Sequence, residues 1–264
     1  MARRRPKGSR DGGRYTFDPS PESKAASSDS DAVSLPGVDR ESLRTVLESA
    51  ARLQQLVPNI VLVGGSAAAL WADHRTSSDH DHVLADLSER FDVVLEALES
   101  SEGWTTNRAV PSKIILGELG GIESGVRQLV RERPLETCEI ELDSGLSLRV
   151  PTFDETMRIK GYLIVRRNQT RDYLDVAALA ERRGVNHCAH VLSVIDDYYE
   201  DQRGPADRGV ATQLARQLAD PQPRDVRSTT QLSSYRELDS RWHKWDDVVE
   251  VCRDVATRMV EPTS

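Results

Sequence analysis

The spacing of apolar and polar residues divides the chain into an early mixed part and a late helical part. Residues 38–56 carry apolar side chains at three- and four-residue intervals, which predicts a helix. Residues 60–63 form a short β-branched run that ends at two glycines, which predicts a buried strand entering a tight turn. The Ala- and Leu-rich residues 66–71 predict the helix that follows this turn.

The rest of the chain continues with strands and then helices. A strand carrying Asp79 and Asp81 precedes a helix over 91–98, and Thr152 with Glu155 forms a capping box that begins a helix ending near residue 167. Thr170 is expected to cap the next helix, and the residues beyond it are polar and helical. Further short strands are predicted at 112–116, 126–130, 137–142 and 146–150, the last two joined as a hairpin. This order predicts an α+β fold with a mixed sheet and a helical C-terminal lobe.

The predicted domain organisation has a tail, an α/β core and a helical lobe. Residues 1–36 begin with clustered arginines and continue with Ser, Pro, Asp and Ala, so they cannot bury enough apolar surface to order and are expected to be disordered. The basic cluster either tethers RNA through phosphates or is a solvated tail without a specific role. Residues 37–150 are expected to form an α/β core, and residues 151–264 the helical lobe.

Composition limits the class of protein. The chain has 264 residues, of which 38% are hydrophobic and 30% charged, enough for one large core or two modest ones. Apolar runs long enough to span a bilayer and a signal-peptide pattern are both missing, so a cytoplasmic protein without membrane contact is expected. Cys138, Cys188 and Cys252 lack metal-type spacing and are interpreted as buried apolar residues. The net charge of −8 argues against general affinity for nucleic acid.

The glycine turn and the acidic strand carry the candidate chemistry. Side chains alternate along a strand, so Asp79 and Asp81 face the same way, with Cα atoms roughly 6.6 Å apart. Two such carboxylates can hold Mg²⁺, whose charge suits triphosphate oxygens. A glycine turn that opens a helix, here Gly64-Gly65-Ser66, offers backbone N–H groups and the positive dipole end to the same phosphates.

These residues resemble the core motif of a known superfamily. Gly64-Gly65-Ser66 followed by Arg75, Asp79 and Asp81 is similar to the motif of the DNA polymerase β-like nucleotidyltransferases. A second segment resembles the helix pair of the AbiEii-type toxins of abortive-infection and toxin–antitoxin systems. It contains Lys160 and, one helix later, Arg171-Asp172-Tyr173 and Asp175.

The resemblance implies roles for particular residues. Lys160 would neutralise triphosphate charge, Arg75 would contact phosphate, and Asp172, ahead of Asp175, would act in the site. Superfamily members use a third carboxylate on a later strand. Glu139 and Glu141, which share one face of the strand 137–142, are the candidates, and the sequence does not separate them.

Each of these residues also has a structural interpretation. Ser66 can cap its helix, Arg75 can pair with a neighbouring aspartate, and Lys160 can be a solvated helix residue. Strand alternation turns His80 and His82 away from the carboxylates. They are either extra metal ligands or, the favoured interpretation, a hydrogen-bonded pair behind the site.

The activity implied is NTP-dependent nucleotidyl transfer with release of pyrophosphate. Asp79 and Asp81 would bridge two Mg²⁺ ions, while Gly65, Ser66 and Lys160 hold the phosphates. By the resemblance, the acceptor would be an RNA 3′ end, with transfer RNA first, the protein would be a toxin, and a cognate antitoxin would exist. Two alternatives stay open: an acceptor that is a small molecule or a protein hydroxyl, and a catalytically silent binding module.

Overall fold

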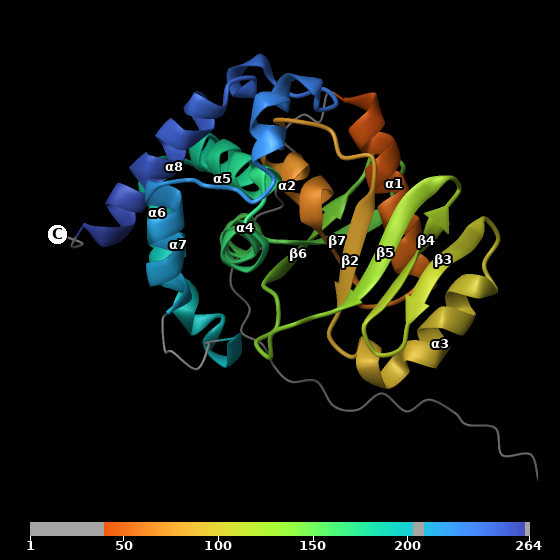
Figure 1. Cartoon of the computed structure of the whole chain (residues 1–264). Coiled ribbons are helices and arrows are strands. Elements are labelled where there is room, and N and C mark those ends of the chain that lie inside the picture. Colours follow the sequence, from red (N-terminus) through yellow and green to blue (C-terminus); the bar gives the residue numbers. More distant parts are fainter. Residues whose placement is uncertain (1–39, 203–208, 262–264) are drawn as a thin grey trace, which may run out of the picture. The chain divides into compact units, whose positions relative to one another are not determined.

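The computed structural model describes residues 40–202 and 209–261, which belong to one compact unit, Val33–Ser264 (Figure 1). The predicted tail, residues 1–36, lies outside the described residues. Within the described part, every helix is too short or too polar to cross a bilayer.

The first half of the described chain contains a mixed sheet. Its strand order is β1-β2-β5-β4-β3. Strand β2 runs antiparallel to β1 and parallel to β5, and the remaining neighbours are antiparallel. The strands are β1 (Val61–Val63), β2 (His80–Leu84), β3 (Trp104–Val110), β4 (Ile114–Leu119) and β5 (Ile122–Gln128).

A separate hairpin follows this sheet. Strands β6 (Thr137–Glu141) and β7 (Ser147–Pro151) pair only with each other among the described strands, although β7 packs beside β1. The hairpin therefore adds no strand next to β2. This matters because Asp81 lies on β2 and Asp79 directly precedes this strand.

Two helices cover one face of the mixed sheet. Helices α1 (Glu41–Leu56) and α3 (Leu87–Glu99) bury apolar side chains against Leu84, Ile115 and Val126. Since side chains alternate along a strand, Asp81 and Val83 point to the opposite face. Helix α2 (Gly64–Ala72) leads from β1 towards β2 and packs against the helical part.

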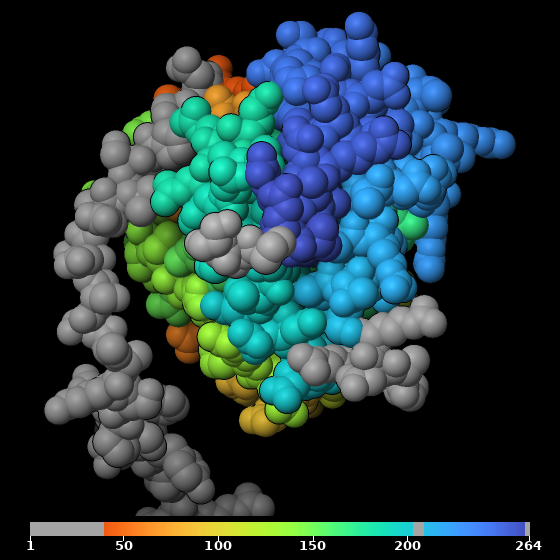
Figure 2. Space-filling view, turned by 90° about the vertical axis from the view of Figure 1, so that its left-hand side faces the viewer, coloured from red at the N-terminus to blue at the C-terminus, as the bar shows by residue number. Residues whose placement is uncertain are grey.

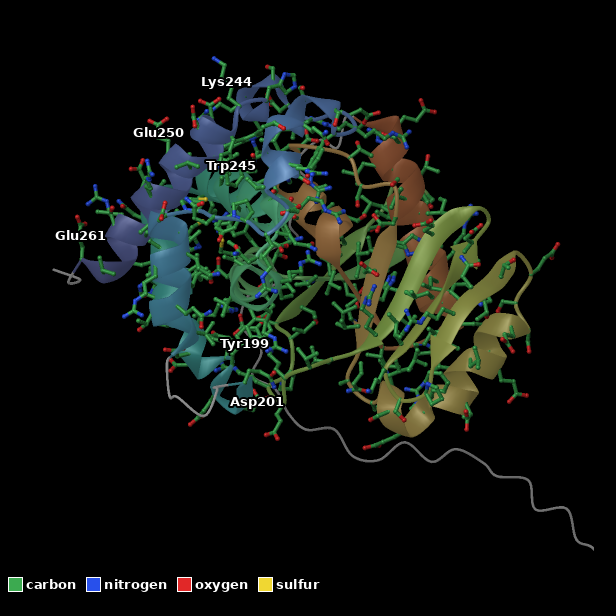
Figure 3. The ribbon with its side chains drawn as sticks, in the orientation of Figure 1. Tyr199, Asp201, Lys244, Trp245, Glu250 and Glu261 are labelled. Atoms are coloured by element: carbon green, nitrogen blue, oxygen red, sulfur yellow. The ribbon has the colours of Figure 1, made fainter. Side chains whose placement is uncertain are left out.

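The second half of the chain is helical. Figure 2 views the face on which α6 to α8 lie at the surface, while α5 is enclosed between α2, α4 and α8. Trp245, at the start of α8 (Figure 3), packs edge-on against Tyr173, with ring centroids 5.9 Å apart. The helices are α4 (Phe153–Arg167), α5 (Thr170–Arg183), α6 (Val185–Ser193), α7 (Val210–Ala219) and α8 (Trp245–Val260). Short 3₁₀ turns lie at η1 (Ile195–Asp197), η2 (Glu200–Gln202), η3 (Val226–Thr230), η4 (Leu232–Ser234) and η5 (Ser240–Trp242).

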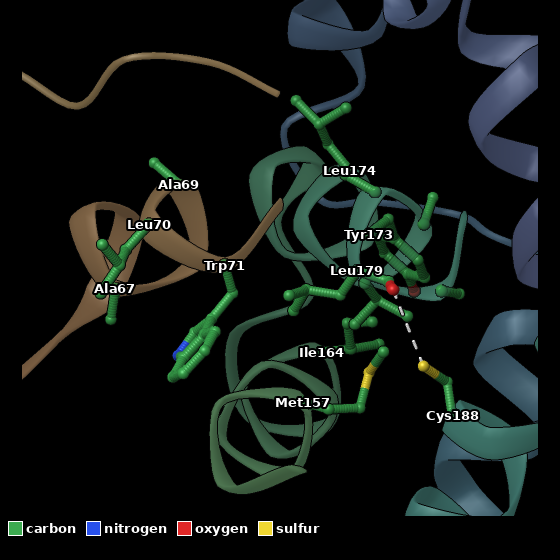
Figure 4. Close-up of a cluster of buried hydrophobic side chains, with 14 of the residues drawn as sticks. Ala67, Ala69, Leu70, Trp71, Met157, Ile164, Tyr173, Leu174, Leu179 and Cys188 are labelled. Atoms are coloured by element: carbon green, nitrogen blue, oxygen red, sulfur yellow. Dashed lines mark hydrogen bonds between the residues drawn. The ribbon is translucent and has the colours of Figure 1, made fainter. Parts of the chain in front are cut away.

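The larger hydrophobic cluster joins the two halves. Figure 4 shows Trp71 of α2 together with Met157 of α4, Tyr173 of α5 and Cys188 of α6. The Cys188 thiol lies 3.8 Å from the backbone oxygen of Leu179. This cluster includes residues from both sides of position 150, and the division into a core of 37–150 and a lobe of 151–264 stays a prediction.

The α+β architecture is confirmed, and the two predicted helix caps have different outcomes. Thr152 caps α4, since its hydroxyl accepts a hydrogen bond from the Glu155 backbone N–H at 3.2 Å. Thr170 is not a cap: it is the first residue of α5, and its hydroxyl and backbone N–H both donate to Asp225. Strand β3 was not predicted, because only its first residue is buried in the core.

Candidate functional site

A pocket of about 390 Å³ lies between the open face of the sheet and helices α4 and α5. The turn after β1, the loop before β2 and the strands β2 and β5 form one wall. Lys160 and Arg167 of α4, with Arg171 and Asp175 of α5, contribute the other. The pocket therefore combines residues from both halves of the described chain.

The glycine turn brings backbone close to charged side chains. Gly64 has φ +77, a conformation that favours glycine, and it begins α2 directly after β1. A Cβ on Gly65 would lie 2.8 Å from Nη2 of Arg75 and 2.7 Å from Oγ of Ser77. Only glycine fits here without displacing Arg75, so the Gly64-Gly65 sequence is required by the geometry of the pocket wall.

The two candidate carboxylates line this pocket together. Asp81 is the residue of β2 that lies opposite Val63 of β1 and Gly125 of β5. Asp79 precedes the strand, and its Oδ1 accepts a hydrogen bond of 2.7 Å from the Ser77 hydroxyl. The alternation predicted from the sequence thus places both carboxylates on the pocket side of the sheet.

A buried cluster of His74, Arg75, Lys160 and Asp175, here called the Asp175 cluster, forms the inner wall. Lys160 Nζ lies 2.6 Å from Oδ2 of Asp175. Arg75 donates to both oxygens, at 3.0 and 3.2 Å, and His74 Nε2 lies 2.8 Å from Oδ1. The Lys160 side chain is only 2% exposed. One carboxylate thus holds two cationic side chains at fixed positions.

The charge of this cluster follows from burial and from the neighbouring groups. Burial alone would raise the pKa of Asp175, but Arg75, Lys160 and His74 together hold that pKa well below its ordinary value. Burial, together with Arg75 and Lys160, lowers the pKa of His74 below its ordinary value although Asp175 raises it, so the ring is neutral at pH 7. Two cations and one carboxylate therefore leave one net positive charge buried beside the pocket.

Further cations stand around the opening. Arg127 of β5 pairs with Asp81, and Arg167 donates to both oxygens of Asp172, each at 2.6 Å. Arg171 is exposed. The pocket lining contains the cationic residues Arg75, Arg127, Arg131, Lys160, Arg167 and Arg171 and the carboxylates Asp79, Asp81 and Asp175. A lining with more cations than carboxylates suits a polyanionic ligand.

Part of the pocket lining is aromatic. Tyr199 (Figure 3) stacks on Tyr162 with ring centroids 4.0 Å apart, and both rings border the pocket with Leu163. Arg131 lies over the Tyr199 ring at 4.9 Å and pairs with the buried Glu155 at 2.6 Å. The pocket therefore has a charged part and an aromatic part.

The structure brings together most of the residues that the sequence indicated. Six predicted site residues line the pocket: Gly64, Gly65, Arg75, Asp79, Asp81 and Lys160. Arg75 pairs with an aspartate, as one of its two interpretations had it, and its contact with phosphate stays a prediction. Lys160 is not a solvated helix residue, because it is buried against Asp175.

Two predicted residues are near the pocket without lining it. Ser66 is buried, and its hydroxyl donates to the Asp79 backbone oxygen at 2.6 Å, so it neither caps α2 nor faces the pocket. Asp172 is fully buried, and Arg167 occupies both of its oxygens. Asp175, which was placed second in the sequence interpretation, is the aspartate of this helix that lines the pocket.

Glu139 and Glu141 lie elsewhere. Strand β6 pairs with β7, and the Glu139 carboxylate binds Arg149 and Ser147 of that hairpin. Neither glutamate lines the pocket. The expectation that one of them supplies a third carboxylate is therefore wrong. The alternation identified a half-exposed strand, but this strand belongs to the two-stranded sheet and not to the sheet that contains β2.

The two histidines lie behind the acidic strand, as alternation predicted. His80 Nε2 lies 3.0 Å from the Ser49 hydroxyl and 2.9 Å from that of Ser124. His82 is fully buried, and neither of its ring nitrogens has a hydrogen-bond partner among the described residues. The hydrogen-bonded pair is thus realised only for His80, and neither ring faces the carboxylates.

Sequence reasoning missed Arg127, Arg131 and Arg167. An arginine in the last turn of a helix, such as Arg167, ordinarily complements the helix dipole, and an arginine on a strand ordinarily faces solvent. The only available signal was Asp172, since a buried aspartate in a first turn needs a cation and the preceding helix ends in two arginines.

No family model matches the chain. Part of it is similar to long mycobacterial proteins: it is 31% identical over 231 residues to the mycolic acid-containing lipids exporter MmpL11 of Mycolicibacterium smegmatis. It is also 31% identical over 248 residues to the heme uptake protein MmpL11 of Mycobacterium tuberculosis. These matches cover 88% and 83% of this chain but 23% of each relative, so the chain spans less than a quarter of those proteins.

Among solved structures, the chain is similar to MenT4, a nucleotidyltransferase toxin of Mycobacterium tuberculosis. The TM-score is 0.53 at 19% identity, and the match covers 84% of each chain. A putative nucleotidyltransferase from H. pylori matches 82% of this chain and 91% of its own, with a TM-score of 0.43 at 15% identity. The α+β fold, a mixed five-stranded sheet followed by a helical region, is therefore similar to the fold of MenT4.

Proposed function

We propose that this protein transfers a nucleoside monophosphate from an NTP to an acceptor hydroxyl and releases pyrophosphate. The observation that carries the proposal is the pocket in which the glycine turn, Asp79, Asp81 and the Asp175 cluster meet. In a nucleotidyltransferase fold, this combination joins anion-binding groups to a pair of metal-binding carboxylates.

Asp79 and Asp81 are proposed to hold Mg²⁺. The described residues contain no group of three or more His, Cys, Asp and Glu side chains that could bind a metal by themselves. A two-carboxylate site nevertheless fits Mg²⁺, which is usually bound by one or two carboxylates together with substrate phosphates. When bound, the metal neutralises charge on the reacting phosphate. The third carboxylate of the lining, Asp175, is bound by Arg75, Lys160 and His74, so Asp79 and Asp81 alone are proposed as metal ligands and the proposal is limited to one Mg²⁺ ion.

The Asp175 cluster is proposed to bind the triphosphate. The Lys160 ammonium has three N–H donors and uses one of them on Asp175, so its other donors are available for phosphate oxygens. Arg75 lies against Gly65, so the backbone of the turn and the guanidinium face the same ligand. Because Asp175 holds both cations before substrate arrives, they need no rearrangement to stabilise the developing charge.

RNA is proposed as the acceptor, with the 3′ end of transfer RNA first. Six cationic side chains against three carboxylates in the lining favour a polyanionic acceptor over a small cationic one. The fold similarity to the toxin MenT4 supports a toxin role, and a cognate antitoxin is then expected. The presence of Asp79, Asp81 and Lys160 in one pocket counts against a catalytically silent binding module.

The experiment that tests this proposal is labelling with each NTP. The protein is incubated with Mg²⁺, total RNA and NTPs carrying radioactive phosphorus at the α position; label is expected on the 3′ end of RNA, and γ-labelled NTPs should transfer none. Asp79→Ala should abolish labelling. Asp86→Ala, which changes a half-exposed carboxylate outside the pocket, is the matched control and should retain it.

The outcomes separate the alternatives. Label on a small molecule or a protein with none on RNA would replace RNA as the acceptor while keeping the enzyme class. Labelling that persists in Asp79→Ala would remove Asp79 from the metal site. Growth arrest on expression of the wild-type chain and normal growth with Asp79→Ala would support the toxin role.

A further inference from the structure

The strand beside the acidic pair carries an arginine. In the parallel register of β2 and β5, Asp81 lies opposite Gly125, and Val83 lies opposite Arg127. Gly125 and Arg127 are two residues apart, so both belong to the face of the sheet that carries Asp81. The neighbour of Asp81 on the pocket side is therefore a cation rather than a further carboxylate.

The contact between Arg127 and Asp81 is direct and solvent-accessible. Arg127 Nε lies 3.3 Å from Oδ1 of Asp81, and the two side chains are 47% and 34% exposed. A Cβ on Gly125 would lie 2.9 Å from the same Oδ1 atom. The absent side chain at Gly125 thus leaves the space in which the Asp81 carboxylate extends towards Arg127.

Arg127 differs from Arg75, Lys160 and Arg167 in its freedom to leave. Arg75 and Lys160 are buried and fixed on Asp175, and Arg167 is bound through two hydrogen bonds to a buried aspartate. Arg127 has one partner among the described residues, and exposed ion pairs of this kind are weak. A divalent cation on Asp81 would repel the guanidinium at this distance.

We propose that Arg127 is an exchangeable counter-ion of the metal site. It neutralises Asp81 while no divalent cation is bound, leaves Asp81 when the metal binds, and then donates to the phosphates of the nucleotide. The inference rests on the proposed function. It couples the two ligands, because the metal frees the cation that the nucleotide uses; by linkage the nucleotide also favours metal binding.

Metal affinity tests the first half of this proposal. Binding of Mn²⁺ is measured by electron paramagnetic resonance on the full chain without nucleotide. Arg127→Ala should lower the Mn²⁺ Kd by about tenfold, because a competing positive charge is removed. Arg90→Ala is the matched control: Arg90 pairs with Asp86 at 3.3 Å with side chains 35% and 44% exposed, and Mn²⁺ affinity should not change.

Polyphosphate affinity tests the second half. In saturating Mg²⁺, tripolyphosphate should bind Arg127→Ala about fivefold more weakly than wild type, since one charged donor is lost. Arg127→Lys should recover part of this affinity, and Arg90→Ala should behave as wild type. Tighter metal binding with weaker polyphosphate binding is a pair of opposite changes that general damage to the fold would not produce.

The results that overturn the inference are distinct from those that overturn the function. If Mn²⁺ binding requires Asp79 but is unaffected by Arg127→Ala, the counter-ion role is wrong and the metal site stands. If both affinities fall together in Arg127→Ala, Arg127 is only structural. If wild type and Arg127→Ala both fail to bind Mn²⁺, the proposed metal site and this inference fail together.

Discussion

Asp172 and Asp175 show how neighbouring residues of one helix take different roles. Both are fully buried, but Asp172 binds an arginine that reaches solvent, whereas Asp175 binds two buried cations and a histidine. Removing the partner of a buried charge is costly, because the charge left behind has no compensation. The two aspartates should therefore differ in their contribution to stability.

We predict that Asp175→Asn lowers the free energy of unfolding by about 3–5 kcal/mol, the range for breaking a buried pair. Asp172→Asn should cost about 1–2 kcal/mol, since Arg167 is 41% exposed and can hydrate. Urea unfolding of both variants and wild type gives the comparison. Equal losses, or a larger loss for Asp172→Asn, would contradict the central position of Asp175.

The histidines behind β2 predict a pH dependence. Burial lowers the pKa of His80 to about 4 and holds the pKa of His82 well below its ordinary value. In the unfolded chain both rings have the ordinary histidine pKa of about 6.5 and bind protons below that pH. In the native state they stay neutral at this pH. Stability should thus be retained above about pH 6.5 and fall as the pH drops towards 4.

His82→Leu tests this dependence. Neither ring nitrogen of His82 has a hydrogen-bond partner in residues 40–202 and 209–261, so leucine loses no hydrogen bond. At neutral pH the stability should change by less than about 1.5 kcal/mol. The decline of unfolding free energy between about pH 6.5 and 4 should be shallower than in wild type. An unchanged slope would show that His82 does not contribute.

At the scale of elements, sequence patterns correctly predicted the features that depend only on a few consecutive residues. The run 60–63 with two glycines, the alternation of Asp79 and Asp81 and the capping box at Thr152 each depend on a few consecutive residues, and the strand, the shared face and the cap are all present. Strand β3 was not predicted because its residues are mostly polar and exposed and show no alternation of apolar positions.

What the sequence did not reveal depends on pairing between distant segments. The alternation of Glu139 and Glu141 was recognised, but no local signal says that the hairpin of β6 and β7 stays apart from β2. Arg127 reaches Asp81 only because β5 lies parallel to β2. The choice between Asp172 and Asp175 depends on where Arg75 and Arg167 lie in space. The periodicity of the sequence does not give these positions.

The turn between β1 and α2 gives a prediction at this scale. A methyl group at position 65 would press on Arg75 and Ser77, and Arg75 cannot yield because Asp175 holds it. Gly65→Ala should therefore cost about 1–3 kcal/mol of stability, as other small overpacking changes do, and reduce nucleotidyl transfer. Gly125→Ala meets only the ends of the Asp81 and Leu116 side chains and should cost less stability. Thermal unfolding of the two variants makes the comparison, and a smaller loss for Gly65→Ala would contradict it.

At the scale of the whole molecule, charge is unevenly distributed. The chain carries a net charge of −8, yet the pocket lining is rich in arginine. Binding of RNA should therefore weaken steeply with salt, because it depends on local phosphate contacts and counter-ion release. Binding curves for transfer RNA at rising salt test this, and an affinity independent of salt would argue for a neutral acceptor.

Residues 1–36 provide a separate test of RNA capture. Deleting 1–34 removes the clustered arginines, so transfer RNA should bind modestly more weakly while NTP affinity is unchanged. A matched variant with the same length and the arginines of the tail replaced by serine should behave like the deletion. Unchanged RNA affinity in both would assign the tail no role in capture.

Asp175 also connects segments that are far apart in the chain. It joins the loop before β2 to α4 and α5, and the larger hydrophobic cluster crosses the same boundary. Neither side can open without exposing both an unpaired charge and apolar surface. Native-state hydrogen exchange should therefore show amides of β2, α4 and α5 exchanging through one common opening of high free energy. A fragment beginning at residue 151 would keep Lys160 but lack His74 and Arg75, the other partners of Asp175, so it should not fold by itself.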